Sequence, residues 1–205
     1  MRIEREKKSK ESVTIVPNGR TQISWERRAC EVAEVVYKGK TYTRNNSKWV
    51  DKDCMVVHES LQRELNQIYL QATDFSSYGL KELIDEGDKF KASDTYEPAI
   101  AFYEKAIELC DEETLKYILP RITSCYRQEK RPKKAIELFS YAKRKFGEDF
   151  ITPVLLTSVA AAYCDLQEYE NAFRCCRWAY KRFEGNSDPN LSNVFARIKK
   201  ESGIE

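Results

Sequence analysis

The chain has 205 residues, a third of them charged, and its 35 lysines and arginines nearly balance its 33 aspartates and glutamates. This length suits one domain, or one repeat array with a small appendage. The near balance excludes a strongly basic or acidic protein, and the longest uncharged run, residues 150–164, is too short to span a membrane.

The charge is unevenly distributed along the chain. Residues 1–50 contain 12 Lys and Arg against 6 Asp and Glu, whereas the other 155 residues contain 23 against 27. We expect residues 1–11 to form a flexible basic arm, and their lack of an apolar core argues against a secretory signal. The seven cysteines include no Cys-x-x-Cys pair, so we expect free thiols and a cytoplasmic location.

Residues 12–50 have the alternating pattern of short strands. Val13 and Ile15 precede a turn at residues 17–19, and a second hairpin is centred on Lys38 and Gly39, which can take the positive φ of a tight turn. This pattern predicts a β-meander of four or five strands. A helix over residues 25–36 is the alternative, and it conflicts with the meander at residues 31–33.

A helical period follows over residues 54–71, with Val57, Leu61, Leu65, Ile68 and Tyr69 on one face. Residues 12–75 are therefore predicted to form a small β-hairpin and helix module, ending at a boundary around residues 74–79. Cys54 and His58 would share a helical face, either as half of a metal site or thiol–imidazole pair or in a purely structural role.

Residues 80–185 repeat in three copies, spaced by 36 and then 37 residues. Each copy has an alanine, at Ala99, Ala135 and Ala172, with another alanine seven residues later. A large residue (Leu83, Leu119, Leu156), a small residue (Gly87, Thr123, Ala160) and an aromatic (Phe90, Tyr126, Tyr163) also recur. Apolar residues fall at helical spacing, so each copy is predicted to be a pair of antiparallel helices.

The pairs are predicted to turn near residues 91–95, 128–131 and 165–168. Pro120 lies inside one predicted helix and predicts a kink or a late start there. After the third pair, Asp188 and Pro189 begin a capping helix whose apolar stripe holds Leu191, Val194, Phe195 and Ile198.

These matched columns resemble the tetratricopeptide repeat (TPR) family. The resemblance implies a TPR-like solenoid of three helix pairs over residues 80–185. With the capping helix this array extends over residues 80–205, and the small N-terminal β and helix module precedes it, so the expected fold is mainly α. The period is longer than the usual 34 residues, and Cys176 stands where an aromatic is common.

An enzyme is not expected, and neither is a cofactor or metal. The chain has one histidine and lacks a phosphate-binding glycine loop, a nucleophile elbow and an HExxH motif. The family instead binds protein segments in a groove lined by the first helix of each pair, which makes an adaptor or assembly subunit the expected role. The resemblance places these residues in the partner-binding groove: Lys81, Ile84, Asp88, Lys91, Tyr117, Arg121, Ser124, Arg127, Thr157 and Ala161.

Some members of the family grip the C-terminal carboxylate of a partner with a clamp of five side chains. This clamp is absent here, because its five positions hold Ile84, Asp88, Arg121, Val154 and Ser158. We expect the groove to accept a protein or peptide segment with acidic and apolar side chains.

Nucleic acid is the alternative partner. Basic residues cluster at the second repeat's turn (Arg127, Lys130, Arg131, Lys133, Lys134), on a later helix (Arg174, Arg177, Lys181) and in the β module (Arg20, Arg27, Arg28, Lys38, Lys40, Arg44). Interleaved acidic residues weigh against this alternative, and self-association through apolar residues such as Trp178 is a third possibility.

Overall fold

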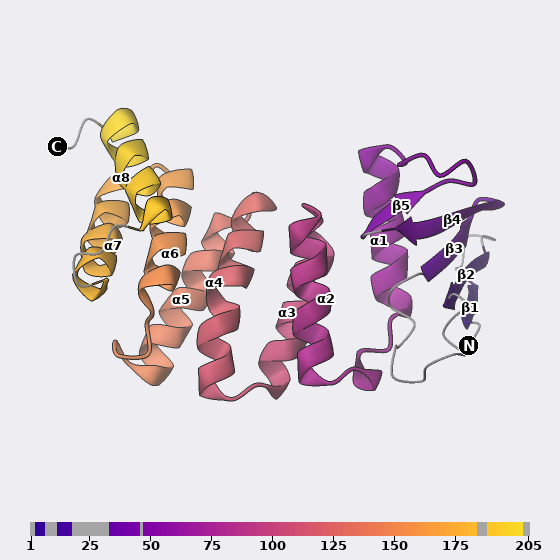
Figure 1. The fold of residues 1–205 in the computed structure, drawn as a ribbon, viewed down its shortest axis with the longest axis horizontal. Coiled ribbons are helices and arrows are strands. Elements are labelled where there is room, and N and C mark those ends of the chain that lie inside the picture. The colour runs from indigo at the N-terminus through magenta and orange to yellow at the C-terminus, as the bar shows by residue number, and fades with distance from the viewer. Residues whose placement is uncertain (1–2, 7–11, 18–32, 46, 184–187, 203–205) are drawn as a thin grey trace. The chain divides into compact units, whose positions relative to one another are not determined.

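The computed structural model describes residues 3–6, 12–17, 33–45, 47–183 and 188–202, with side chains from Ala33 onward (Figure 1). It divides into two compact units, residues 1–105 and 106–205. The division falls inside helix α3 (Tyr96–Leu109). The first predicted helix pair therefore groups with the N-terminal module and not with the later repeats.

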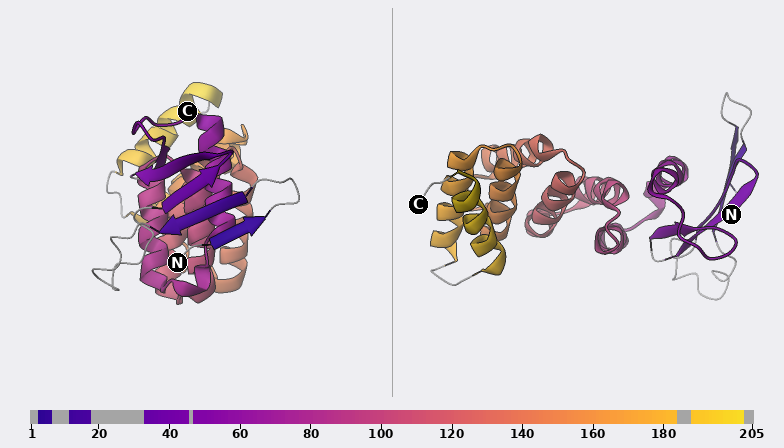
Figure 2. Two further views of the ribbon diagram at one scale, coloured as in Figure 1. Left: turned by 90° about the vertical axis from the view of Figure 1, so that its right-hand side faces the viewer. Right: turned by 90° about the horizontal axis from the view of Figure 1, so that it is seen from above.

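The first unit begins with an antiparallel meander, seen face-on in the left view of Figure 2. Its strands, hydrogen-bonded in chain order, are β1 (Ile3–Glu6), β2 (Ser12–Pro17), β3 (Ala33–Tyr37), β4 (Lys40–Asn45) and β5 (Lys48–Val50). Lys38 and Gly39 have φ values of 50° and 72°, as a two-residue type I′ turn requires. The predicted meander and its second hairpin are confirmed.

The prediction of a flexible arm is wrong at Ile3–Glu6, which forms β1. This strand pairs with β2, with Ile3 opposite Ile15 and Glu6 opposite Ser12. Backbone hydrogen bonds to the neighbouring strand stabilise β1. Such bonds do not depend on the side chains, so a charged sequence does not indicate the strand. The rest of the predicted arm and most of the alternative helix lie outside the described residues, but Ala33–Tyr37 is a strand.

Helix α1 (Glu59–Ala72) follows the sheet and buries Leu65, Ile68 and Tyr69, as predicted. It begins later than predicted, because His58 caps it by accepting a hydrogen bond at Nδ1 from the Ser60 backbone N–H, at 3.3 Å. Cys54 lies before the helix in an exposed turn, so it does not share a helical face with His58. Among the described residues, no three His, Cys, Asp or Glu side chains are grouped to hold a metal ion.

A buried ion pair joins the sheet to helix α2 (Leu80–Ala92). The Arg44 Nη2 and Glu86 Oε2 atoms are 3.1 Å apart, and the two side chains are 3% and 5% exposed. The Arg44 guanidinium also lies against two neighbouring aromatic rings, 4.8 Å from the centroid of Tyr69 and 4.7 Å from that of Phe90. These contacts explain why α2 belongs to the same compact unit as the sheet.

The predicted helix pairs and capping helix are confirmed. The pairs are α2–α3, α4 (Glu112–Gln128) with α5 (Pro132–Phe146), and α6 (Pro153–Asp165) with α7 (Tyr169–Arg182), and α8 (Pro189–Ser202) follows. Within the first pair, a Cβ atom at Gly87 would lie 2.7 Å from the Tyr103 ring, so the small residue permits the close approach of the helices. Pro120 does not delay α4, which begins directly after its N-cap, Asp111.

The three pairs share a turn that the sequence analysis did not predict. Asp94, Lys130 and Gln167 occupy the same repeat position and have φ values of 55°, 58° and 62°. The next backbone N–H in each turn donates to the carbonyl of the first helix's aromatic residue, at 2.8–2.9 Å. This is the Schellman geometry that ends many helices, built here with three residues other than glycine.

One apolar core fills the second unit, where α6 and α7 pack together and α8 covers them. Leu191, Val194 and Ile198 from α8 are buried in this core, as the predicted stripe requires. Burial raises the pKa of the Cys175 thiol to about 11 and that of Cys176 to about 12. In the described part of the chain, no helix combines the length and the apolar character needed to cross a membrane.

Candidate partner-binding surface and basic pocket

Four of the predicted groove residues lie on α2 in the first unit. Lys81 is exposed, and Ile84 and Lys91 are half-buried. Asp88 accepts a hydrogen bond from the Tyr103 hydroxyl of α3, so this carboxylate already has a partner within its own helix pair.

Four further predicted residues form what we call the α4 stripe: Tyr117, Arg121, Ser124 and Arg127. Their spacing of three and four residues places them on one side of the helix. The Tyr117 side chain is 45% exposed, and the Arg121 guanidinium carbon lies 3.3 Å from the centroid of its ring. Arg121 Nη1 also donates to the Tyr117 carbonyl oxygen at 3.0 Å, which fixes the guanidinium over the ring.

The two predicted residues on α6, Thr157 and Ala161, are buried, at 7% and 6% exposed. The Thr157 hydroxyl donates to the Pro153 carbonyl oxygen at 3.0 Å. Helix α6 is apolar on most sides and lies between neighbours, so these positions contribute to packing and leave little surface for a ligand. Val154, near the start of α6, is 52% exposed.

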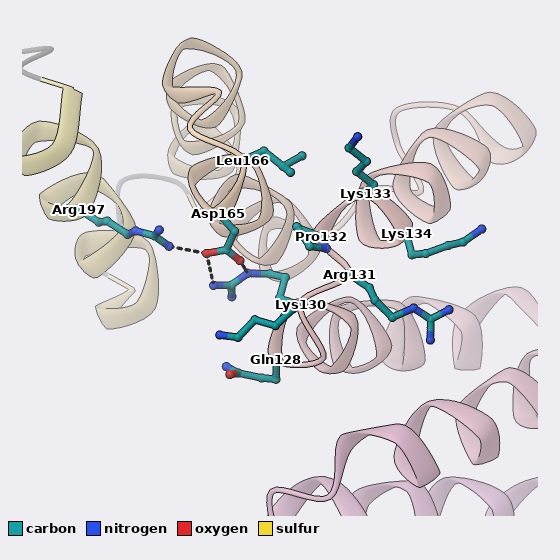
Figure 3. Close-up of a pocket in the computed structure, with 10 residues that line it drawn as sticks. Gln128, Lys130, Arg131, Pro132, Lys133, Lys134, Asp165, Leu166 and Arg197 are labelled. Atoms are coloured by element: carbon teal, nitrogen blue, oxygen red, sulfur yellow. Dashed lines mark hydrogen bonds and ion pairs between the residues drawn. The ribbon is translucent and has the colours of Figure 1, made fainter. Parts of the chain in front are cut away.

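Arg127, the last residue of the α4 stripe, belongs to an ion-pair network that reaches α8. Its Nε atom lies 2.7 Å from Asp165 Oδ2, and Arg197 Nη1 lies 2.6 Å from Asp165 Oδ1 (Figure 3). Arg197 Nε also donates to Glu201, which accepts a hydrogen bond from the Tyr169 hydroxyl. The hydrogen bond to Asp165 raises the pKa of Arg197 above its ordinary value, so this guanidinium stays charged.

A pocket of about 650 Å³ opens beside this network. It is lined by the end of α4, the turn to α5, the end of α6 and α8: Arg127, Gln128, Lys130, Arg131, Pro132, Lys133, Lys134, Asp165, Leu166 and Arg197. We call it the basic pocket. All five residues of the basic cluster predicted at this turn line it, whereas Asp165, Leu166 and Arg197 were not predicted as site residues. The sequence did not indicate that Arg197 belongs to this site, because the residue lies outside the repeats and far from the basic cluster in the chain.

Of the basic residues predicted in the β module, Lys38 and Lys40 are exposed at the β3–β4 hairpin, whereas Arg44 is not. Arg44 is buried in its ion pair with Glu86, and Tyr42 is 7% exposed. Neither can contact a nucleic acid in this arrangement. Arg20, Arg27 and Arg28 lie outside the described residues.

Neither a protein-family model nor a curated protein sequence matches this chain. Among solved structures, the chain is similar to the crystal structure of the Sgt2 TPR domain from Aspergillus fumigatus, with a TM-score of 0.52 and 16% sequence identity. The match covers 60% of this chain and 78% of that one. The likeness shows that the helical part has a TPR-like fold.

Proposed function

We propose that the protein is a non-enzymatic adaptor or assembly subunit, and that its α4 stripe binds a partner segment with acidic and apolar side chains. The observation that carries this proposal is the exposed Tyr117 ring with the Arg121 guanidinium held against it. The TPR-like fold of the helical part supports a protein-binding role by analogy.

The chemistry of this pair suits such a segment. A tyrosine offers a rigid apolar face, and a guanidinium can donate two parallel hydrogen bonds to a carboxylate. Tyrosine and arginine are also the side chains that most often dominate the binding energy of protein interfaces. Since Arg121 is already oriented by the Tyr117 carbonyl, it loses little conformational freedom on binding.

Selection of random peptides displayed on phage against the full chain tests this proposal. The enriched peptides should combine acidic and apolar residues. One enriched peptide is then synthesised and its affinity is measured by fluorescence anisotropy. This affinity should fall about tenfold or more in Tyr117→Ala/Arg121→Ala. Tyr141→Ala/Lys145→Ala is the matched control. Tyr141 is 49% exposed on α5 and also has a cation over its ring, so this variant should bind normally.

Two results would contradict the proposal. In the first, the peptides enriched on the wild-type chain bind the α4 variant equally well. In the second, the selection yields no acidic peptide, while a single-stranded oligonucleotide binds with a steep loss of affinity as salt rises, which would favour nucleic acid as the partner.

A further inference from the structure

The basic pocket brings together cations from separate parts of the second unit. Six cationic side chains and one carboxylate, Asp165, line it. In Figure 3 Lys133 and Leu166 lie at the top of the view, Lys134 and Arg131 at the right, Lys130 below and Arg197 at the left. The positive charge therefore comes from several elements around the pocket and does not follow a single helix face.

The cations of the pocket fall into two groups. Three of them are paired: Arg127 and Arg197 share Asp165, Arg197 also pairs with Glu201, and Lys134 pairs with Glu137. In the part of the chain that the structure describes, the Lys130 and Lys133 side chains form neither an ion pair nor a hydrogen bond, and both are exposed. Arg131 is also exposed and lies over the Tyr126 ring at 5.3 Å. The pocket thus keeps excess positive charge that its own carboxylate does not balance.

The start of α5 adds to this positive field. Arg131 is the N-cap of the helix and makes no side-chain capping hydrogen bond, Pro132 is the first helical residue, and the first turn has no acidic residue. By contrast, α4 begins with the carboxylates of Asp111, Glu112 and Glu113. A helix of 15 residues places a partial positive charge at its N-terminus, which favours a bound anion there.

From these observations we propose that the basic pocket binds a small molecule carrying several phosphate groups. Phosphate groups offer more negative charge and more acceptor oxygens than carboxylates, and they match a mixture of arginine and lysine donors. The volume lies in the range of small-ligand sites, which favours a compact anion over a nucleic-acid strand. Arg127 belongs to both the α4 stripe and the basic pocket. The Tyr117–Arg121 pair does not line the pocket, so either proposal can fail without the other.

Isothermal titration calorimetry of the full chain with inositol hexakisphosphate tests this inference. The wild-type chain should bind one molecule, and Lys130→Gln/Arg131→Gln/Lys133→Gln should weaken binding about tenfold or more, because each charge-assisted hydrogen bond contributes strongly to affinity. The three side chains are exposed, so glutamine should preserve the fold, and thermal unfolding checks this. Inorganic tripolyphosphate should bind the same site more weakly, and sulfate should bind weakest.

A second basic surface supplies the matched control. Lys143, Arg174, Arg177 and Lys181 line another pocket, of about 430 Å³, beside Trp178. Arg174→Gln/Arg177→Gln/Lys181→Gln removes the same number of charges from the same unit and should change the affinity by no more than about twofold. Tyr117→Ala/Arg121→Ala should also bind inositol hexakisphosphate normally.

Three outcomes would overturn the inference. One is that the wild-type chain does not bind inositol hexakisphosphate. Another is that the two charge variants lose affinity equally, which would indicate general electrostatic attraction without a site. The third is that a twelve-nucleotide single strand binds more tightly than inositol hexakisphosphate and requires both basic surfaces, which would indicate a polymer ligand.

Discussion

Glu86 stands in a repeat column that the second and third helix pairs fill with Ile122 and Val159. In those pairs the side chain is apolar and buried, and in the first pair a buried carboxylate meets Arg44. Two buried charges gain from each other only while both are present, because either alone keeps the cost of leaving water. The substitution of one partner should therefore be far more damaging than the substitution of both.

We predict that Glu86→Ala lowers the free energy of unfolding by about 3–5 kcal/mol, because Arg44 is left buried without its counter-charge. Urea denaturation followed by circular dichroism measures this loss. Lys89 is the other partner of Glu86, and the Lys89 side chain is 50% exposed. Lys89→Ala should therefore cost less than about 1 kcal/mol. Arg44→Met/Glu86→Leu should recover most of the stability, and equal losses in the two single variants would contradict this account.

At the scale of helices and turns, the repeat columns predicted the three helix pairs because each column has one packing role. Burial in α6 was harder to predict. The run of residues 150–164 is apolar almost all round, so its periodicity does not identify a free face, and the family alignment placed Thr157 and Ala161 in the groove. The left-handed turn residues were missed because none of Asp94, Lys130 and Gln167 is a glycine.

This turn leads to a prediction in the opposite direction, towards higher stability. Gln167 is exposed with φ of 62°, a conformation that disfavours side chains with a Cβ atom. Gln167→Gly should raise the free energy of unfolding by about 0.5–1 kcal/mol, since the relief of strain exceeds the added chain entropy. Gln167→Ala keeps the strain and should bring no gain in the same urea titration. A gain of similar size in both variants would mean that the turn is not the cause.

At the scale of the whole chain, the sequence predicted the order of the modules but not the division of the structure within α3. The grouping of α2 with the sheet rests on Arg44, Glu86, Tyr69 and Phe90, which meet only once the chain has folded. The basic pocket could likewise be predicted only in part. Its turn residues form a visible cluster in the sequence, whereas Arg197 joins them through the docking of α8.

The same docking of α8 closes the core of the second unit. Val194→Asp places an unpaired charge where the side chain is 9% exposed, and we expect it to cost more than about 3 kcal/mol. Thermal unfolding should show the loss, and sedimentation velocity should show self-association through the uncovered apolar surface. Asn193→Asp, at an exposed position of the same helix, should remain monodisperse with near-normal stability, and an equal effect in the two variants would contradict this role for α8.

The ion pair between Arg44 and Glu86 also limits how this chain could be rebuilt from its parts. The helix pairs share most of their packing columns, yet they are not interchangeable modules. If the second pair replaced the first, Ile122 would stand at the place of Glu86, and the sheet would present its arginine to an apolar side chain. The sheet therefore requires the helix pair that carries this carboxylate, and we expect an exchange of the first pair to cost more stability than an exchange of the later pairs.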